Sequence, residues 1–322
     1  MPVHTRPANP ERDAEGIVAA YNAHVPYQQR LTVEQYLENE THFPPEGQRN
    51  VIIAVTADGN DDTIIGYIDT WHWPWRDEGV FGIEVMVAPN WQGQRIGARL
   101  YGEQLDFLRA HGATQLWVNV RDDDPTSLHF AEQRGYRIDR HIFDSTLDLA
   151  TFDERPFVGA IAAAEARGIG FVTLADQGES EDAQRRLYAI NRAASLDVPG
   201  ADQSFMPFEH WWEMVGTASW YRADGQIAAV DTATGEWVGM AAIGVFPDRD
   251  SAHHMITGVD RRYRGRGLAL ALKLLSLRCA RRYGVAHATT NNDSQNAPIL
   301  AINRKLGYQS DPGFYRMVVG MG

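Results

Sequence analysis

One pattern of apolar and polar positions occurs twice along this chain, at a constant separation in sequence. The segment VDRRYRGRGLALALKLL (259–275) aligns with VAPNWQGQRIGARLYGE (87–103) at an offset of 172 residues, 264 minus 92. Identical residues downstream keep this offset without a gap: Gly112 with Gly284, Asn119 with Asn291, and Gly135-Tyr136 with Gly307-Tyr308. A constant offset over roughly fifty residues is hard to obtain by accident and predicts two copies of one fold. We place the copies at 1–152 and 153–322.

Each copy shows the same order of predicted elements. An apolar strand (82–87 or 254–259) precedes a polar turn and a helix that ends near a glycine, and a second strand and a shorter helix follow. Within the second-copy helix, apolar residues recur at the spacing of one buried face: Leu268, Leu272, Leu275 and Cys279. With an amphipathic helix and β-rich segments upstream in each copy, the pattern predicts an α/β fold with a mixed sheet flanked by helices.

The composition is typical of a soluble globular protein, with 44% apolar and 22% charged residues in a chain of 322. A net charge of -12 disfavours nucleic-acid binding and mildly favours small or cationic partners, although acidic surfaces commonly serve solubility alone. The single cysteine, Cys279, excludes a disulfide framework and a cysteine-rich metal site. Without a signal-peptide pattern or an apolar run of about 18 residues, we expect a cytoplasmic protein with no membrane segment.

The turn Arg264-Gly265-Arg266-Gly267-Leu268-Ala269 combines arginine and glycine directly before a helix. A helix start leaves about four backbone N–H groups without partners and carries a partial positive charge. Glycines let a phosphate approach these donors, and arginine adds charge-assisted hydrogen bonds. The turn therefore predicts a pyrophosphate cradle, with a solvated basic turn as an equally good reading of these six residues alone. Neither a GxGxxG motif after a strand nor a GK[ST] motif is present there.

The order strand, [RQ]-x-x-G-x-[GA], helix, strand, Asn, helix, Leu-Gly-Tyr resembles the GNAT superfamily of acyl-CoA N-acyltransferases. Val259, RGRGLA (264–269), Asn291, Asn296 and INRKLGY (302–308) carry the resemblance. It implies acetyl-CoA (coenzyme A) as cofactor, with its pyrophosphate on the turn and its thiol arm between two splayed parallel strands. The cofactor-binding residues implied in the C-terminal copy are Thr257, Val259, Arg264, Gly265, Arg266, Gly267, Leu268, Ala269, Asn291 and Asn296. The matching residues in the N-terminal copy are Val87, Gln92, Gly93, Gly97 and Ala98.

The two copies differ in this motif. Where the family motif has its first glycine, the C-terminal copy has Gly267 and the N-terminal copy has Arg95. Asn296 aligns with Asp124, which lies in the acidic run RDDDP (121–125). Because a side chain in the cradle and nearby carboxylates disfavour a polyanion, we predict catalysis mainly in the C-terminal copy. The N-terminal copy then binds acyl-CoA weakly or serves as structure.

The resemblance also implies catalytic groups. Glu84 lies on the strand before the first cradle, where many relatives place the carboxylate that deprotonates the amine; the aligned residue in the second copy is Ile256. His254 precedes Ile256 by two residues, so on a regular strand its side chain points to the same side, and a histidine is a plausible base near neutral pH. A partly buried histidine satisfied by a neighbour is an interpretation of His254 at least as good, and a surface or salt-bridged carboxylate is an equally good interpretation of Glu84.

The general acid of many relatives is a tyrosine five residues before the final aromatic residue. Here that position holds Asn303 in the second copy and Ala131 in the first. Asn303 can form a hydrogen bond with a thiol or carbonyl but cannot deliver a proton. Direct attack of a neutral amine on the thioester is then the implied path, with backbone N–H groups near Val259 polarising the carbonyl.

The acceptor region is predicted within 195–213, between the first helix and the early strands of the second copy. Asp197, Glu209, and Trp212 beside Trp211, can hold a cationic, partly apolar amine by charge and cation–π contacts, although core packing is the more common role of a tryptophan pair. The predicted activity is transfer of an acetyl group from acetyl-CoA to a primary amine of a small molecule. A non-catalytic acyl-CoA-binding protein and a protein N-acetyltransferase are the alternatives. The two copies form a built-in pseudo-dimer, so a monomer is self-sufficient, while homo-oligomers stay open.

Overall fold

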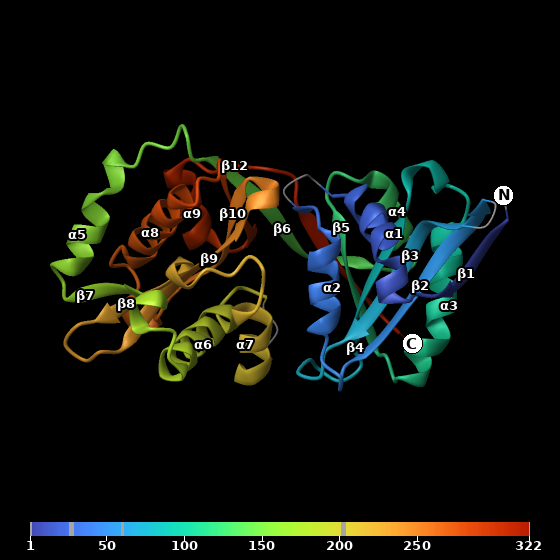
Figure 1. Ribbon diagram of the computed structural model, residues 1–322, viewed down its shortest axis with the longest axis horizontal. Coiled ribbons are helices and arrows are strands. Elements are labelled where there is room, and N and C mark those ends of the chain that lie inside the picture. The colour runs from blue at the N-terminus through green and yellow to red at the C-terminus, as the bar shows by residue number, and fades with distance from the viewer. Residues whose placement is uncertain (1, 26–28, 59–60, 201–203, 322) are drawn as a thin grey trace. The chain divides into compact units, whose positions relative to one another are not determined.

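The computed structural model describes residues 2–25, 29–58, 61–200 and 204–321. The chain folds into two compact units: unit 1 comprises Met1–Asp139 and Tyr315–Gly322, and unit 2 comprises Arg140–Phe314. Each unit is a sheet flanked by helices (Figure 1), as the pattern predicted. No helix of the described residues is long and apolar enough to cross a membrane.

The two units are not consecutive segments of the chain, so they differ from the predicted copies 1–152 and 153–322. Strand β6 (Arg137–Asp148) pairs with β11 in the sheet of unit 2, whereas β13 (Phe314–Gly320), at the end of the chain, follows β5 in the sheet of unit 1. The last strand of each repeat therefore completes the other sheet. A repeat in sequence marks equivalent elements but contains no signal for which sheet an element joins.

Unit 1 contains strands in the order β1-β2-β3-β4-β5-β13. The bounds of its first five strands are β1 Val3–Pro7, β2 Gln48–Asp58, β3 Asp61–His72, β4 Val80–Val87 and β5 Gln115–Arg121. Helices α1 (Pro10–Asn22) and α2 (Val33–Thr41) pack on one face, around Ile17, Tyr36 and Tyr67. Helices α3 (Ile96–Ala110) and α4 (Pro125–Glu132) pack on the other, around Phe81 and Leu100. Alternating residues of β2 and β3 supply the two cores.

Unit 2 repeats this plan with strands in the order β6-β11-β10-β9-β8-β7, and the short β12 (Gln309–Ser310) also pairs with β6. The other strands are β7 Ile169–Thr173, β8 Gln226–Asp231, β9 Trp237–Phe246, β10 Ser251–Val259 and β11 His287–Asp293. The helices are α5 Gly159–Glu165, α6 Glu181–Leu196, α7 Phe208–Gly216, α8 Leu268–Arg282 and α9 Ala297–Leu306.

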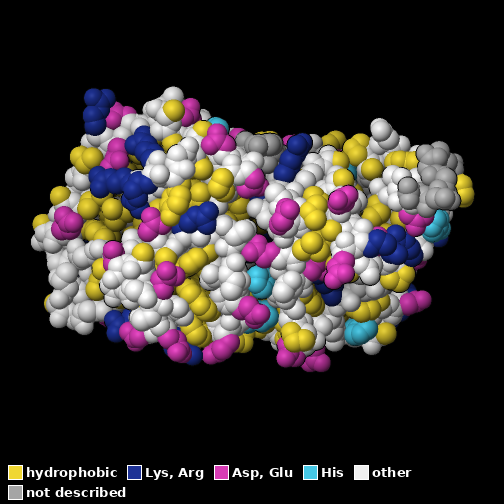
Figure 2. All heavy atoms as spheres, in the orientation of Figure 1, with side chains coloured by type: hydrophobic (Ala, Val, Ile, Leu, Met, Phe, Trp, Pro, Cys, Tyr) yellow, Lys and Arg dark blue, Asp and Glu magenta, His cyan; other side chains and the backbone are white. Residues whose placement is uncertain are grey.

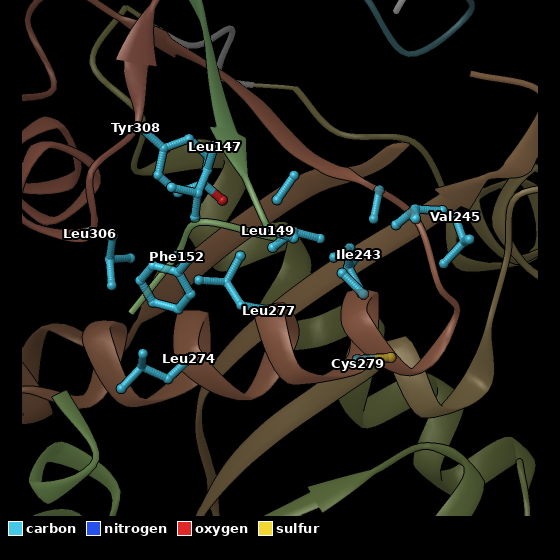
Figure 3. Close-up of a cluster of buried hydrophobic side chains, with 14 of the residues drawn as sticks. Leu147, Leu149, Phe152, Ile243, Val245, Leu274, Leu277, Cys279, Leu306 and Tyr308 are labelled. Atoms are coloured by element: carbon cyan, nitrogen blue, oxygen red, sulfur yellow. The ribbon is translucent and has the colours of Figure 1, made fainter. Parts of the chain in front are cut away.

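The two faces of the unit 2 sheet have separate cores. Helices α6 and α7 pack against Met240 and Ala242 of β9. Helix α8 packs against the opposite face, where Figure 3 shows Leu277 close to Leu149 and Phe152. Cys279 is buried in this second core, as core packing predicted.

Charged side chains are distributed over both units. On the face shown in Figure 2, acidic and basic side chains are interspersed, and acidic ones lie along the lower edge of both units. Among the described residues, no group of three or more His, Cys, Asp and Glu side chains is arranged to hold a metal ion.

Candidate active site

Each unit contains a fork between two parallel strands. In unit 1, β4 and β5 pair through Val80–Gly82 and Gln115–Trp117, and in unit 2, β10 and β11 pair through Ser251–His253 and His287–Thr289. Within the described residues the pairing stops there, although β10 continues to Val259 and β11 to Asp293. This is the opening between splayed strands that the resemblance implies, and both units have it.

The turn of unit 2 lies at the end of β10 and leads into α8. Gly265 and Gly267 have φ angles of 73° and 79°, a left-handed conformation that favours glycine, and Gly267 is the N-cap of α8. No described side chain caps this helix, so the first N–H groups of α8 face the turn without side-chain partners. A Cβ atom added at either glycine meets no described atom within 4 Å. The turn therefore has both the donors and the open space that a diphosphate requires.

Arginine side chains surround this turn. The Nε atom of Arg264 donates a hydrogen bond of 3.0 Å to the carbonyl oxygen of Val259. Arg266 donates to the carbonyl oxygen of Arg262 at 3.1 Å, and its guanidinium lies 5.0 Å from the ring centroid of Tyr263. Arg264 also forms an ion pair with Asp197, which follows α6 as its C-cap.

Asp197 is therefore placed differently from the prediction that it contacts an acceptor amine. Its carboxylate bonds to both Arg261 and Arg264, and its side chain is 16% exposed. A groove of about 1130 Å³ lies between α6, the β8–β9 turn and the cradle, and Asp197 and Arg264 are among the residues that line it. The Asp197 carboxylate therefore pairs with the guanidinium group of Arg264 that the cradle would offer to a phosphate.

The turn of unit 1 has the same backbone shape. Gly93 and Arg95 have φ angles of 75° and 64°, and Arg95 is the N-cap of α3, which no described side chain caps. Gln92 donates to the carbonyl oxygen of Val87 at 3.3 Å, as Arg264 does to Val259. An arginine in the left-handed conformation costs about 1–2 kcal/mol relative to glycine. Arg95 therefore keeps the cradle backbone at an energetic cost.

The two units also differ at the residue that precedes their second, shorter helix, α4 in unit 1 and α9 in unit 2. Asp124 caps α4 by accepting hydrogen bonds from the N–H groups of Thr126 and Ser127. Asn296 is the N-cap of α9 without a side-chain cap bond. On the strands, Asn291 is exposed on β11 beyond the fork, and the hydroxyl of Thr257 on β10 is buried without a hydrogen-bond partner in the described residues.

His254 does not point to the same side as Ile256, so that prediction is wrong. In the pairing of β10 with β9, His254 lies opposite Ile243 and Ile256 opposite Ala242, because Met255 forms a β-bulge. The extra residue sends His254 to the α8 face and Ile256 to the α6–α7 core. His254 is 3% exposed, and burial holds the pKa of its imidazole well below the usual value. It is thus a neutral core histidine.

His253 is the histidine of β10 on the face of α6 and α7. It lies opposite Gly244, where an added Cβ would meet the ring of Trp220, just after α7. Its Nδ1 atom is 2.9 Å from the hydroxyl oxygen of Thr289, and burial lowers the pKa of the imidazole to about 4. Sequence reasoning missed His253, since only the strand register reveals the bulge.

Glu84 lies on the α1–α2 face of β4, directly opposite Asp69 of β3. The hydroxyl of Tyr67 donates a hydrogen bond of 2.5 Å to Oε1 of Glu84, whereas Asp69 is paired with Arg49 at 2.7 Å. Burial raises the pKa of Glu84 to about 7 against the opposing effect of the Tyr67 hydrogen bond. A carboxyl group with this pKa can exchange a proton near neutral pH.

Asn303 is 2% exposed and takes part in a buried hydrogen-bond network. Its amide accepts a hydrogen bond from Lys273 at 2.6 Å and donates one to Asn292 at 2.6 Å. Lys273 was overlooked in the sequence because it sits within an apolar helical run, where a lysine is usually expected to reach solvent.

The remaining predicted acceptor residues have structural contacts. Glu209 is exposed and forms an ion pair of 3.2 Å with Arg185. Trp212 packs against Trp211 and Tyr221, with ring centroids 6.0 and 5.8 Å away. Core packing, the alternative interpretation of the tryptophan pair, is what the structure shows.

Comparisons with known proteins agree with this geometry. The family model described as "Acetyltransferase (GNAT) family" matches residues 18–136 and 186–308. A mycothiol acetyltransferase from Nocardioides sp. is 25% identical over 242 residues, which cover 70% of this chain and 76% of that protein. One from Saccharomonospora viridis is 34% identical over 99 residues, 29% of this chain and 32% of that protein.

Solved structures share the two-unit fold. A tandem GNAT protein from the clavulanic acid biosynthesis pathway has a TM-score of 0.77 at 19% identity and covers 100% of this chain and 99% of its own. A GCN5-related N-acetyltransferase from Sphaerobacter thermophilus has a TM-score of 0.71 at 21% identity, with 99% and 95% covered. With two forks, two cradles and a family model that matches most of each repeat, the chain belongs to the GNAT acetyltransferase family as a tandem member.

Proposed function

We propose that this protein transfers an acetyl group from acetyl-CoA to a primary amine of a small molecule, mainly in unit 2. The cradle of unit 2 carries the proposal: an uncapped helix start preceded by two glycines at positive φ, beside a strand fork. Unit 1 reaches the same backbone shape only with Arg95 in a strained conformation. Relatives named as mycothiol acetyltransferases support acetyl transfer as the reaction.

Residues of unit 2 then have defined roles toward the cofactor, which supplies the activated acetyl group. The N–H groups of Gly265 to Ala269 and the guanidinium of Arg264 would hold the pyrophosphate. The backbone N–H of Val259 would polarise the thioester carbonyl, and Thr257, Asn291 and Asn296 would line the thiol arm. Because Ile256 occupies the position of the base, the amine must reach this unit already neutral.

The proposal is tested by incubating the purified protein with acetyl-CoA and a broad panel of small amines, and separately with peptides that contain free N-termini and lysines. We expect acetylated small amines and free CoA. Acetylated peptides alone would mean that the protein is a protein N-acetyltransferase. Tight binding of acetyl-CoA without any product would mean a non-catalytic acyl-CoA-binding protein.

Removing the carboxylate beside the cradle should strengthen cofactor binding. In Asp197→Asn, Arg264 and Arg261 lose the partner that competes with the pyrophosphate, so we expect acetyl-CoA to bind about 3- to 10-fold more tightly. Calorimetric titration at two salt concentrations measures this. Glu209→Gln, which removes an exposed carboxylate of the same unit, is the control, and equal effects of both variants would contradict the contact-based explanation.

A second candidate is transfer in unit 1, with unit 2 as a non-catalytic acyl-CoA site. Glu84 favours it, because unit 1 has a carboxyl group on the strand before its cradle and unit 2 has Ile256 there. The acceptor would then lose its proton to Glu84.

Glu84→Gln separates these candidates and has a defined effect on stability. Since the folded-state pKa of Glu84 is raised from 4.5 to about 7, the carboxyl group favours the folded state below pH 4.5, and this stability is lost as the pH rises through 7. The variant should therefore be more stable than the wild type by about 3 kcal/mol at pH 8 and no more stable at pH 4.5. Urea denaturation at both pH values measures the difference, and an equal difference at the two would contradict the raised pKa.

The same variant reports on transfer. If unit 1 transfers the acetyl group, the rate falls by about 10²- to 10⁴-fold and its rise near pH 7 disappears. A pH profile of the rate for wild type and Glu84→Gln thus assigns the reaction to one unit.

A further inference from the structure

A cluster of polar side chains is buried in unit 2 on the α8 and α9 side of the strand fork. Its buried members are His254 of β10, Lys273 of α8, Asn303 of α9 and Tyr308 after α9, and the half-buried Asn292 of β11 adjoins them. Nζ of Lys273 lies 2.6 Å from Oδ1 of Asn303 and 4.8 Å from the ring centroid of Tyr308. Lys273 is 1% exposed, and Figure 3 shows Tyr308 beside Leu147 in the core.

The cluster lies where the strands separate. His254 is the first residue of β10 beyond the last pair with β11, and Asn292 lies three residues beyond the last paired residue of β11. Both ring nitrogens of His254 and the hydroxyl of Tyr308 are buried and have no hydrogen-bond partner within the described chain. Burying these polar groups at the fork costs free energy of desolvation that hydrogen bonds within the described chain do not offset.

Unit 1 shows that the fold does not need these polar groups. Like His254 in β10, Ile83 is the first residue of β4 beyond the last strand pair, and at the offset of 172 residues the other positions hold Tyr101, Val120, Ala131 and Tyr136. The two tyrosine hydroxyls lie 3.4 Å apart, and the rest of the position is apolar. Since burying a lysine and an amide is costlier than packing apolar side chains, a role in packing does not explain why unit 2 has Lys273 and Asn303 there.

Lys273 fixes the orientation of the Asn303 amide. An ammonium group only donates hydrogen bonds, so Oδ1 of Asn303 must face Nζ, and the Nδ2 donors must face β11. Burial lowers the pKa of Lys273 to about 7. His254 and Tyr308 are titratable groups on the same face of the sheet, and His253 interacts with Lys273 electrostatically from the other face. Both histidines are neutral near pH 7, so Lys273 is the group of this cluster that gains a proton and a positive charge as the pH falls through 7.

We infer that Lys273 positions Asn303 as the hydrogen-bond donor to the sulfur that leaves in unit 2. The inference rests on the proposed function. As the bond from the amine nitrogen to the acetyl carbon forms and the carbon–sulfur bond breaks, the sulfur keeps the electron pair of the broken bond. Asn303 donates an N–H to this thiolate and the ammonium of Lys273 stabilises its charge, while the proton displaced from the amine nitrogen passes to water. Lys273 and Asn303 together thereby stabilise the leaving thiolate without a general acid, since Asn303 cannot donate a proton to it.

The test uses the wild-type protein, because Lys273 and Lys305 are its two lysines and Lys305 is exposed. In protein labelled with ¹³C at the lysine side chains, NMR titration follows both pKa values, and Lys305→Arg assigns the signals. We expect CoA to raise the pKa of Lys273 by about one unit or more, because a thiolate nearby stabilises the ammonium. Desulfo-CoA, which lacks the sulfur, should leave it near the value of the free protein. Equal shifts with the two ligands, or none, would overturn the inference.

The reciprocal measurement is the pKa of the bound CoA thiol, read from the ultraviolet absorbance of the thiolate. Coupling between two groups is mutual, so Lys273→Met should raise this pKa by about as much as CoA raises that of Lys273. We also expect Lys273→Met to unfold at a denaturant concentration no lower than the wild type at pH 7. Lower stability together with an unchanged thiol pKa would mean a structural lysine. Calorimetric titration of the wild type with CoA separates the two proposals. Absence of CoA binding to unit 2 would refute the proposed function, whereas CoA binding without the two pKa shifts would refute only this inference.

Discussion

Arg264→Ala is expected to weaken the binding of acetyl-CoA about 10- to 100-fold. The loss follows from the removal of charge-assisted hydrogen bonds to a phosphate, which contribute about 1.5–3 kcal/mol each. The ion pair with Asp197 moderates it, because part of the interaction replaces one already present in the free protein. The glycines and the helix start of the cradle remain, so binding is weakened and not abolished.

Calorimetric titration measures both the affinity and the number of sites. The matched control is Gln92→Ala, since Gln92 makes the same backbone contact in unit 1 that Arg264 makes in unit 2. One site per chain, sensitive to Arg264→Ala and insensitive to Gln92→Ala, is the expected result. Two sites, each sensitive to its own variant, would show that Arg95 does not prevent binding in unit 1. No binding in the wild type would refute acyl transfer.

Met317→Ala is expected to destabilise unit 1 by about 2–5 kcal/mol, the usual cost of emptying a buried methionine position. Met317 lies on β13 and is 1% exposed within the core of unit 1 that Phe81, Leu100 and Leu116 also form. The free energy of unfolding of a domain is about 5–15 kcal/mol, so a single substitution near the chain's end removes a large part of it. The prediction tests the strand exchange, because a consecutive division of the chain would assign Met317 to the C-terminal copy.

Thermal unfolding followed by tryptophan fluorescence measures the effect, with hydrogen exchange locating it. Met255→Ala is the control, since Met255 is also on a strand but 42% exposed, and a change of about 0.5 kcal/mol or less is expected. We expect faster exchange in β4 and β5 of unit 1 for Met317→Ala. Faster exchange confined to α8 and β11 would place β13 in unit 2 and contradict the exchange.

Features encoded by neighbouring residues could be predicted from the sequence. The offset of 172 residues identified equivalent elements, and the buried face of α8 followed from the spacing of Leu268, Leu272 and Cys279. The glycines of the cradle marked a backbone conformation that other residues adopt only at a cost. Periodicity and glycine position are local properties, so each is visible before the chain is folded.

Asp197 was named from the sequence, but its role was not. Its charge made it a candidate for contact with an amine, and the fold instead brings the end of α6 to the cradle, where the same charge pairs with Arg264. The residue type was informative, and its partner depended on an approach between segments more than sixty residues apart.

By itself the sequence determined that two copies of one α/β fold are present, that a cradle precedes α8, and that Glu84 and Ile256 are equivalent. The tertiary structure alone decided that Met255 is a bulge, that β6 and β13 each complete the other sheet, and that Lys273 is buried against Asn303. The reason is physical. A single extra residue in a strand reverses the face to which all residues on one side of it point. The partner of a strand and the surroundings of a buried charge depend on contacts between distant segments, which no periodic pattern in the sequence encodes.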